Sequence, residues 1–419
     1  MLQALRNAAD ALVGVFRRHA WIGWIGWGIF VAVALARIHP RRFASTFSAY
    51  LDAAHRLAAG EQVYDPATLG DFLYFPLTLL IYFPFTLLDR VVSAAVALVI
   101  AAAFFSWACT RLSIALAPRD WRPVEAIALT GIPLLINIPA AWFNFKGVQA
   151  QVPMTAAMIA AGAAMAASRW RAASFWLFVA IAIKPLAIVM VLLSGALIRE
   201  TRLMLLAALA AVLLLPFLFL DWSYLAEQYR AMGWKLWHIA TAAPEEWPYQ
   251  ADFSTMLRGL GLQLPAGAVL AIRVAAALGT LALAWRVKRD GGPRSLALAV
   301  LMLSGCYITL FGPRNEFLSF IVLTPPLAIL AGHMLIRNDA RGWLLVLASL
   351  TLGFAFDLQT DAVLKPAIVV AIYGWLTWVM LVPARWYEIV EGRAAVRPSA
   401  DEAVMTAALV ADRRRSPSG

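Results

Sequence analysis

Charged residues are scarce in this 419-residue chain. Asp, Glu, Lys and Arg together make up 14% of it, whereas hydrophobic residues make up 62%. A soluble domain is about half apolar and about one quarter charged. The apolar residues gather in runs of roughly 17 to 25, the length that a helix needs to cross a bilayer. The composition excludes an ordinary soluble protein and predicts an all-α, polytopic helical membrane protein.

Cysteine is rarer still, and the pattern of a metal site is missing. Cys109 and Cys306 both lie within apolar runs, and we interpret them as small core residues, not as a disulfide or a metal pair. The five histidines are scattered, without a His-Glu-x-x-His spacing. We therefore predict no metal and no cofactor.

Acidic residues are outnumbered by basic ones, 24 to 35, which gives a net charge of +11. The arginines stand at the ends of the apolar runs, and no basic helix with base-reading side chains occurs. The charge therefore excludes a nucleic-acid partner and favours topology signals and attraction to anionic membrane lipids. Strand-type alternation, internal repeats and a phosphate-cradling glycine loop are also missing.

The apolar runs define twelve candidate spans. They cover residues 20–37, 72–88, 91–110, 124–140, 148–167, 172–197, 203–220, 266–286, 295–311, 317–336, 342–356 and 366–384. With the N-terminus in the cytoplasm, most basic segments fall inside, as the positive-inside rule requires. We expect a multi-pass protein of a bacterial inner membrane with both termini cytoplasmic and with its first span retained as an uncleaved anchor.

Two long polar segments, 38–71 and 221–265, fall on the outer face in this topology. They divide the chain into a membrane domain, 1–385, with these two outer loops, and a tail, 386–419, in which we expect little fixed structure. In the first loop, helical spacing relates Phe47, Tyr50, Leu51, Ala54 and Leu57, and Gly60 follows as a helix stop. In the second, aromatic residues from Tyr224 to Trp237 predict an amphipathic helix in the membrane interface; its aromatics either anchor it there or bind sugar.

The first loop holds most of the outer acids before residue 221. Asp52 and Arg56 form an i,i+4 pair on a different helix face from Tyr50. Low-dielectric lipid nearby can raise the pKa of a carboxylate at a membrane surface, and such a carboxylate can act as a general base. The alternative interpretation of Asp52 is a solvated surface pair.

Lys184 and Pro185 interrupt an otherwise apolar span. An unpaired lysine at the centre of a span costs roughly 2.5 to 3.5 kcal/mol, and proline frees helix carbonyls. The lysine either binds a phosphate anion in a cavity or pairs with a neighbouring carbonyl. Nearby, Gln149 and Gln151 start the fifth span, where helix-to-helix hydrogen bonding explains them as well as substrate contact does.

A tight outer turn, Gly312-Pro313-Arg314-Asn315-Glu316, offers a second cation and a second acid. Arginine suits bidentate phosphate recognition, although Glu316 could instead neutralise Arg314 locally. We name Asp52 and Glu316 as candidate catalytic bases, in that order. The candidate substrate-binding residues are Arg314, Lys184, Gln151, Tyr50, Tyr74 and Arg42.

The order of several short motifs resembles the GT-C class of membrane glycosyltransferases and, within it, glycosyltransferase family 87, which includes polyprenol-phosphate-mannose-dependent alpha-(1,2)-mannosyltransferases. The motifs are Tyr50-Leu51-Asp52-Ala53-Ala54, Val63-Tyr64-Asp65-Pro66, Phe72-Leu73-Tyr74-Phe75-Pro76, Phe83-Pro84-Phe85, Gln151-Val152, Ile181-Ala182-Ile183-Lys184-Pro185, Phe253-Ser254-Thr255-Met256-Leu257 and Gly312 to Glu316.

The resemblance implies transfer of a sugar from a polyprenyl-phosphate donor to a lipid-linked or glycan acceptor on the outer face. It also implies an aspartate base in the first loop, just before a Phe-x-x-Tyr element, but Thr46 stands there. A histidine common in the late turn of the family is replaced as well. Asp52 or Glu316 would then serve as base, and a catalytically silent polyprenyl-phosphate-binding protein or a lipid or small-molecule transporter are the alternatives.

Overall fold

The computed structural model describes residues 19, 21–38, 45–65, 72–117, 122–241, 250–312, 315–337 and 339–391. Almost all of these residues lie in helices, as the composition predicted, so the protein is an all-α polytopic membrane protein. In the described part of the chain, pairing of strand type is limited to one isolated antiparallel bridge, between Gln250 and Glu316.

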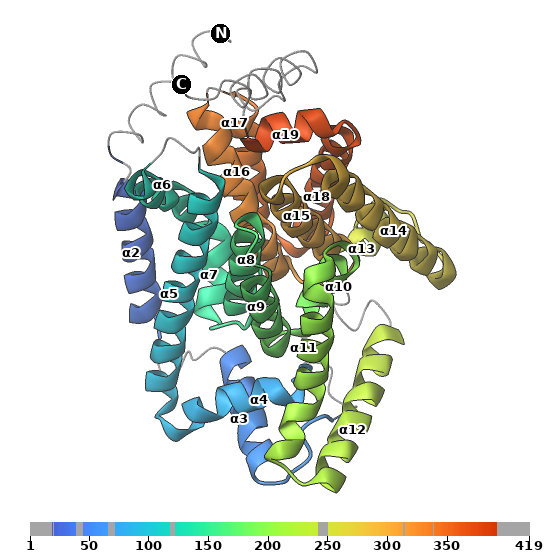
Figure 1. The fold of residues 1–419 in the computed structure, drawn as a ribbon. Coiled ribbons are helices and arrows are strands. Elements are labelled where there is room, and N and C mark those ends of the chain that lie inside the picture. Colours follow the sequence, from blue (N-terminus) through green and yellow to red (C-terminus); the bar gives the residue numbers. More distant parts are fainter. Residues whose placement is uncertain are drawn as a thin grey trace, which may run out of the picture.

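The helices follow one another through the whole described chain (Figure 1). They are α2 (Trp21–Ala36), α3 (Ser45–Ala58), α4 (Pro76–Tyr82), η2 (Phe83–Leu87), α5 (Arg90–Leu116), α6 (Pro123–Ile136), α7 (Ile138–Lys146), α8 (Gln151–Ala166), α9 (Trp170–Ile183), η3 (Pro185–Ala187), α10 (Ile188–Leu197), η4 (Arg199–Thr201), α11 (Arg202–Leu214), η5 (Leu215–Leu218), α12 (Trp222–Thr241), α13 (Phe253–Gly259), α14 (Ala266–Asp290), α15 (Pro293–Phe311), η7 (Phe317–Val322), α16 (Thr324–Ile336), α17 (Gly342–Gly353), α18 (Leu358–Leu381) and α19 (Pro383–Glu391).

Helix α8 forms the centre of the bundle and is buried along nearly its whole length. Its sequence is rich in alanine, and Gly162 brings its backbone close to α15: a methyl group there would lie 3.3 Å from Leu301 Cδ2. Small residues allow helices to approach closely within a membrane. Helices α5, α9 and α15 therefore pack tightly around α8.

Six helices in the described part of the chain are long and apolar enough to cross a bilayer, or seven if α6 and α7 form one span bent by 68°. Six shorter apolar segments account for the other predicted spans, so the count of twelve is not confirmed. Segment 72–88 differs most from the expectation. Its apolar helix, Pro76–Leu87, has 12 residues, whereas a span needs about 20.

The two predicted outer loops meet at one end of the bundle. Figure 1 shows α3, α4 and α12 together there, with α17 and α19 at the opposite end. The Tyr224 hydroxyl donates to the Glu61 carbonyl at 2.7 Å, and Gln228 accepts from the Val63 amide at 3.0 Å. Helix α12 therefore packs on the turn that follows α3. It has the predicted helical form, and the indoles of Trp234 and Trp237 are exposed.

Candidate functional site

Helix α3 presents one side to the bundle. Phe47, Tyr50, Leu51, Ala54 and Leu57 are all buried, as their spacing predicted. The helix ends at Gly60, whose φ of +72° favours glycine. The Glu61 amide then donates to the Arg56 carbonyl and the Gly60 amide to the Leu57 carbonyl, which is a Schellman cap. This cap fixes the length of the helix and hence the position of Tyr50.

The break at Lys184 is a real interruption of a helix. Helix α9 ends at Ile183, Lys184 is extended (φ −152°, ψ 128°), and Pro185 opens the next helical turn. Proline has no N–H and leaves carbonyls of the preceding turn without their helical partners. The Thr78 hydroxyl of α4 donates to one of them, Ala182, at 2.7 Å. The break thus turns the lysine out of the helix and joins it to the segment that carries Tyr74.

A strained turn precedes α8. Val148 has a φ of +43°, a conformation that costs a β-branched residue of order 1 to 3 kcal/mol. Gln149 and Gln151 follow directly, and both amides contact other segments. Such strain persists only where surrounding contacts impose it. Here the strained turn at Val148 stands next to the two glutamines, whose side chains are held by contacts with other segments.

These segments bring together the polar cluster, by which we mean Thr46, Tyr50, Tyr74, Gln149, Gln151, Lys184 and Glu316. Lys184 Nζ donates to Gln151 Oε1 at 2.5 Å and lies 5.3 Å from the centroid of the Tyr74 ring. The Tyr74 and Tyr50 hydroxyl oxygens are 3.1 Å apart. The sequence candidates Lys184, Gln151, Tyr50 and Tyr74 therefore share one site.

The first loop and α8 are also linked within the cluster. Tyr50 donates to Gln149 Oε1 at 3.4 Å, and Gln149 Nε2 donates to Thr46 Oγ1 at 2.9 Å. Burial raises the pKa of both Tyr50 and Tyr74, so their hydroxyls stay protonated at neutral pH. The tyrosines can position a ligand by neutral hydrogen bonds, but they cannot act as the base.

Glu316 supplies the acid. It is half-buried, and its carboxylate acts electrostatically on Tyr50, Tyr74 and Lys184. Its backbone forms the bridge to Gln250, and the adjacent Asn315 donates to the Ala251 carbonyl at 2.8 Å and accepts from the Ala251 amide at 2.7 Å. The end of the second outer loop therefore holds the turn that carries this acid.

Asp52, our first candidate base, lies elsewhere on α3. Its carboxylate is 2.6 Å from Arg90, in place of the predicted partner Arg56, and its side chain is 47% exposed. Two residues of helix correspond to a rotation of about 200°, so Asp52 and Tyr50 point in nearly opposite directions. No contact in the described ranges joins Asp52 to the polar cluster.

Two of the candidate binding residues cannot be placed, and two residues of the polar cluster were not among the candidates. Arg42 and Arg314 lie outside the described residues. Thr46 and Gln149, which we did not name as site residues, belong to the cluster. The Phe-x-x-Tyr element immediately after Thr46 was the signal for Thr46. The signal for Gln149 was a polar residue at the start of an apolar span, which we had explained equally well by helix-to-helix hydrogen bonding.

The cluster offers one cation, one carboxylate and several neutral donors. Gln151 Nε2 is buried without a hydrogen-bond partner among the described residues, and such a buried donor costs about 1 to 3 kcal/mol unless something accepts its proton. Within those same residues, no three His, Cys, Asp or Glu side chains lie close enough to hold a metal ion. The arrangement suits a ligand with an anionic group beside a hydroxyl.

Comparison with known proteins gives one result of consequence. A family model, described as Glycosyltransferase family 87, matches residues 72–313. It thus includes Tyr74, Gln149, Gln151 and Lys184, but it ends before Glu316 and begins after α3. No individual curated protein matches the chain.

Proposed function

Because the chain belongs to glycosyltransferase family 87 and is therefore a membrane glycosyltransferase, we propose that it transfers a hexose from a polyprenyl-phosphate donor at the polar cluster, with mannose the hexose that the family resemblance suggests. The acceptor is a lipid-linked or glycan hydroxyl at the outer face of a bacterial inner membrane. One observation carries the proposal: Lys184 lies over the Tyr74 ring, and Glu316, opposite in charge and 132 residues away in the sequence, acts electrostatically on Lys184 and on both Tyr50 and Tyr74.

The donor phosphate occupies the lysine side of the cluster. Lys184 Nζ provides the charge, and the free Gln151 Nε2 provides a neutral donor to a second phosphate oxygen. We place the sugar beside the Tyr50 and Tyr74 hydroxyls, whose oxygens are 3.1 Å apart. Arg314 stands two positions before Glu316 in the sequence, and we propose that it binds the same phosphate. Arg42, in the first loop, is the remaining candidate for that contact.

The reaction is a single displacement. Glu316 takes the proton of the acceptor hydroxyl, whose oxygen bonds to the anomeric carbon while the bond from that carbon to the phosphate oxygen breaks. Positive charge develops on the sugar ring in the transition state, as in other glycosyl transfers. The electron pair of the broken bond stays on the leaving phosphate, and Lys184 stabilises that charge. The reaction inverts the configuration at the anomeric carbon and uses no metal.

The test measures polyprenyl phosphate released by the purified protein from a radiolabelled polyprenyl-phosphate sugar. A charged donor to phosphate contributes about 1.5 to 3 kcal/mol, so Lys184→Gln should lower kcat/KM about 10- to 100-fold. Lys288→Gln is the matched control, since Lys288 binds the Leu197 carbonyl and stacks on Trp285, outside the cluster. Equal rates for the two variants would contradict the assignment of Lys184.

A second candidate function rests on Thr46, which stands where the resemblance implies an acid. In that case the chain binds the polyprenyl phosphate and does not turn it over. Saturable binding that depends on Lys184, together with no release of carrier from any sugar donor, would favour this silent carrier-binding protein. Movement of labelled carrier across sealed vesicles would instead favour a transporter.

A further inference from the structure

A buried ion pair on the membrane helix α18 lies against the short helix that follows the proposed base. Lys365 Nζ is 3.2 Å from Asp361 Oδ1, and the two side chains are 1% and 5% exposed. Charged residues within membrane spans are rare and usually have a functional role. A buried ion pair can often be replaced by apolar residues without loss of stability. Stability alone therefore does not explain why this pair is present.

The ammonium group of Lys365 lies over two aromatic rings of η7. It is 5.4 Å from the centroid of the Phe317 ring and 5.7 Å from that of the Phe320 ring. At such distances the negative face of an aromatic ring attracts a cation. The Asp361 carboxylate also accepts from the Phe356 amide at 3.3 Å, which ties the pair to the start of α18. The pair thus joins α18 to both rings of η7.

Helix η7 depends on contacts of this kind with its neighbours. It is a 3₁₀-helix, in which the backbone hydrogen bonds are weaker than in an α-helix. Helix α7 supplies further contacts. The Asn144 side chain donates to the Leu318 carbonyl at 3.0 Å, and the Phe143 ring meets the Phe317 ring edge-on at 5.8 Å. Phe317 is therefore held by a ring from α7 and by a cation from α18.

Glu316 stands immediately before η7. Its carbonyl accepts from the Ser319 amide at 2.9 Å, so its backbone belongs to the first turn of this helix. A rotation or tilt of η7 would move the Glu316 side chain with it. Misplacing a reacting group by about 1 Å can lower a rate about 10²-fold. The contacts that hold Phe317 thus also set the position of the carboxylate.

We propose that Lys365 is a positioning residue for Glu316. Its ammonium, oriented by Asp361, holds the Phe317 and Phe320 rings and with them η7, so that the carboxylate stays directed toward the polar cluster. The inference rests on the proposed function, in which Glu316 takes the proton of the acceptor hydroxyl. Because Lys365 acts through η7 and not on the substrate, its loss lowers kcat and leaves donor binding unchanged.

The test uses the double substitution Asp361→Leu with Lys365→Met, which replaces the pair by apolar side chains and preserves the fold. We expect kcat for the release of polyprenyl phosphate to fall about 10- to 100-fold, while KM for the donor stays within about threefold. Phe317→Leu keeps the ion pair and removes one ring, so kcat should fall about 3- to 10-fold. This single variant decides the question if the double variant does not fold.

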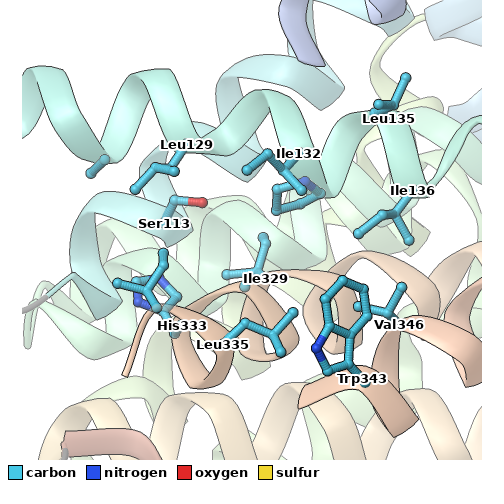
Figure 2. Close-up of a pocket in the computed structure, with 14 residues that line it drawn as sticks. Ser113, Leu129, Ile132, Leu135, Ile136, Ile329, His333, Leu335, Trp343 and Val346 are labelled. Atoms are coloured by element: carbon cyan, nitrogen blue, oxygen red, sulfur yellow. The ribbon is translucent and has the colours of Figure 1, made fainter. Parts of the chain in front are cut away.

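Ile329→Ala is the control for a general loss of stability. Ile329 lies on α16, the helix that follows η7, and lines an apolar cavity between α6, α16 and α17 (Figure 2). The substitution enlarges this cavity and lowers the melting temperature, but it keeps the ion pair and both rings of η7. Its kcat should stay within about twofold of the wild type.

Hydrogen exchange of the full-length protein in nanodiscs gives a second measurement, which needs no turnover. The Ser319 amide, bonded to the Glu316 carbonyl, should exchange about tenfold faster in the double variant, with the amides of α8 unchanged. Unchanged kcat or unchanged exchange at Ser319 would overturn the inference, as would an equal loss of kcat in Ile329→Ala. If the wild type releases no carrier, the proposed function fails, and exchange at Ser319 still decides whether Lys365 holds η7.

Discussion

Asp52 and Glu316 are both carboxylates at the end of the molecule where the two outer loops meet, yet their surroundings differ. Asp52 is half exposed and paired with Arg90 at 2.6 Å on the outer side of α3. Glu316 is half-buried and acts electrostatically on Lys184 and on two tyrosines. The difference shows that the direction of a side chain, more than its closeness to a motif in the sequence, decides which residues an acid contacts. We therefore place Glu316 before Asp52 as the proposed base.

The largest expected effect is that of Glu316→Gln. The amide keeps the shape of the side chain but accepts no proton, so kcat for the release of polyprenyl phosphate should fall about 10²- to 10⁴-fold. Donor binding, measured by the retention of labelled carrier, should stay within about threefold, because Lys184 remains. Normal turnover by Glu316→Gln together with lost turnover in Asp52→Asn would contradict our choice of Glu316 over Asp52 as the base.

The next largest effect is on stability and concerns the buried ion pair of Asp361 and Lys365. Asp361 and Lys365 form an ion pair at 3.2 Å whose side chains are 5% and 1% exposed, and the ammonium also lies over the Phe317 and Phe320 rings. Asp361→Asn leaves a buried charge without its partner, so the free energy of unfolding should fall by about 3 to 5 kcal/mol. Thermal unfolding in detergent gives the measurement, with Arg90→Gln as the exposed counterpart.

The double substitution Asp361→Leu with Lys365→Met sharpens this test. Replacing a buried pair by apolar groups of similar volume is often neutral, so most of the lost stability should return. The contrary result is that Asp361→Asn lowers the free energy of unfolding no more than Arg90→Gln does. In that case burial does not decide how much an ion pair contributes to stability, and our distinction between exposed and buried acids loses its physical basis.

Thr46 offers a smaller and more specific effect. Its hydroxyl accepts from Gln149 at 2.9 Å, within the polar cluster, so Thr46→Asp places a carboxylate where the family resemblance implies one. In the Glu316→Gln background, this second acid should restore activity at least about tenfold. Thr46→Asn in the same background tests whether the charge is needed. Equal recovery by the two double variants would rule out proton transfer at this position.

Asp52→Asn should have the smallest effect. An exposed ion pair contributes about 0 to 1 kcal/mol to stability, and the side chain points away from the cluster. Turnover should therefore stay within about twofold of the wild type, and the melting temperature should change little. A loss as large as that of Glu316→Gln would return Asp52 to the role of base.

Much of this arrangement follows from the sequence. The scarcity of charge predicted the membrane fold, and the spacing from Phe47 to Leu57 predicted the buried side of α3. That same helical phase already separated Asp52 from Tyr50. The Lys184-Pro185 pair predicted a helix break. These features are local, because each depends on residues within a few turns of one another.

Other features depend on packing between distant segments, which local patterns do not encode. The bond from Gln149 to Thr46 joins residues 103 positions apart, and Arg90 replaced Arg56 as the partner of Asp52 because α5 begins beside α3. Counting apolar runs also distinguished membrane spans poorly from other apolar segments. The run at 72–88 was predicted as a span, but it forms a short helix beside α3. Hydropathy reports that a segment is buried or in lipid, but not which of the two.

The bonds between Asn315 and Ala251 hold Glu316 without touching any substrate. Their loss would leave every reacting group in place and widen the range of positions that the carboxylate samples before each turnover. Pre-arranged groups lower the entropic part of a barrier. Asn315→Ala removes the side-chain bonds to the Ala251 and Thr309 carbonyls and leaves the backbone bond from the Ala251 amide. This partial loosening should show itself in the temperature dependence of the rate, as a more negative activation entropy with a nearly unchanged activation enthalpy.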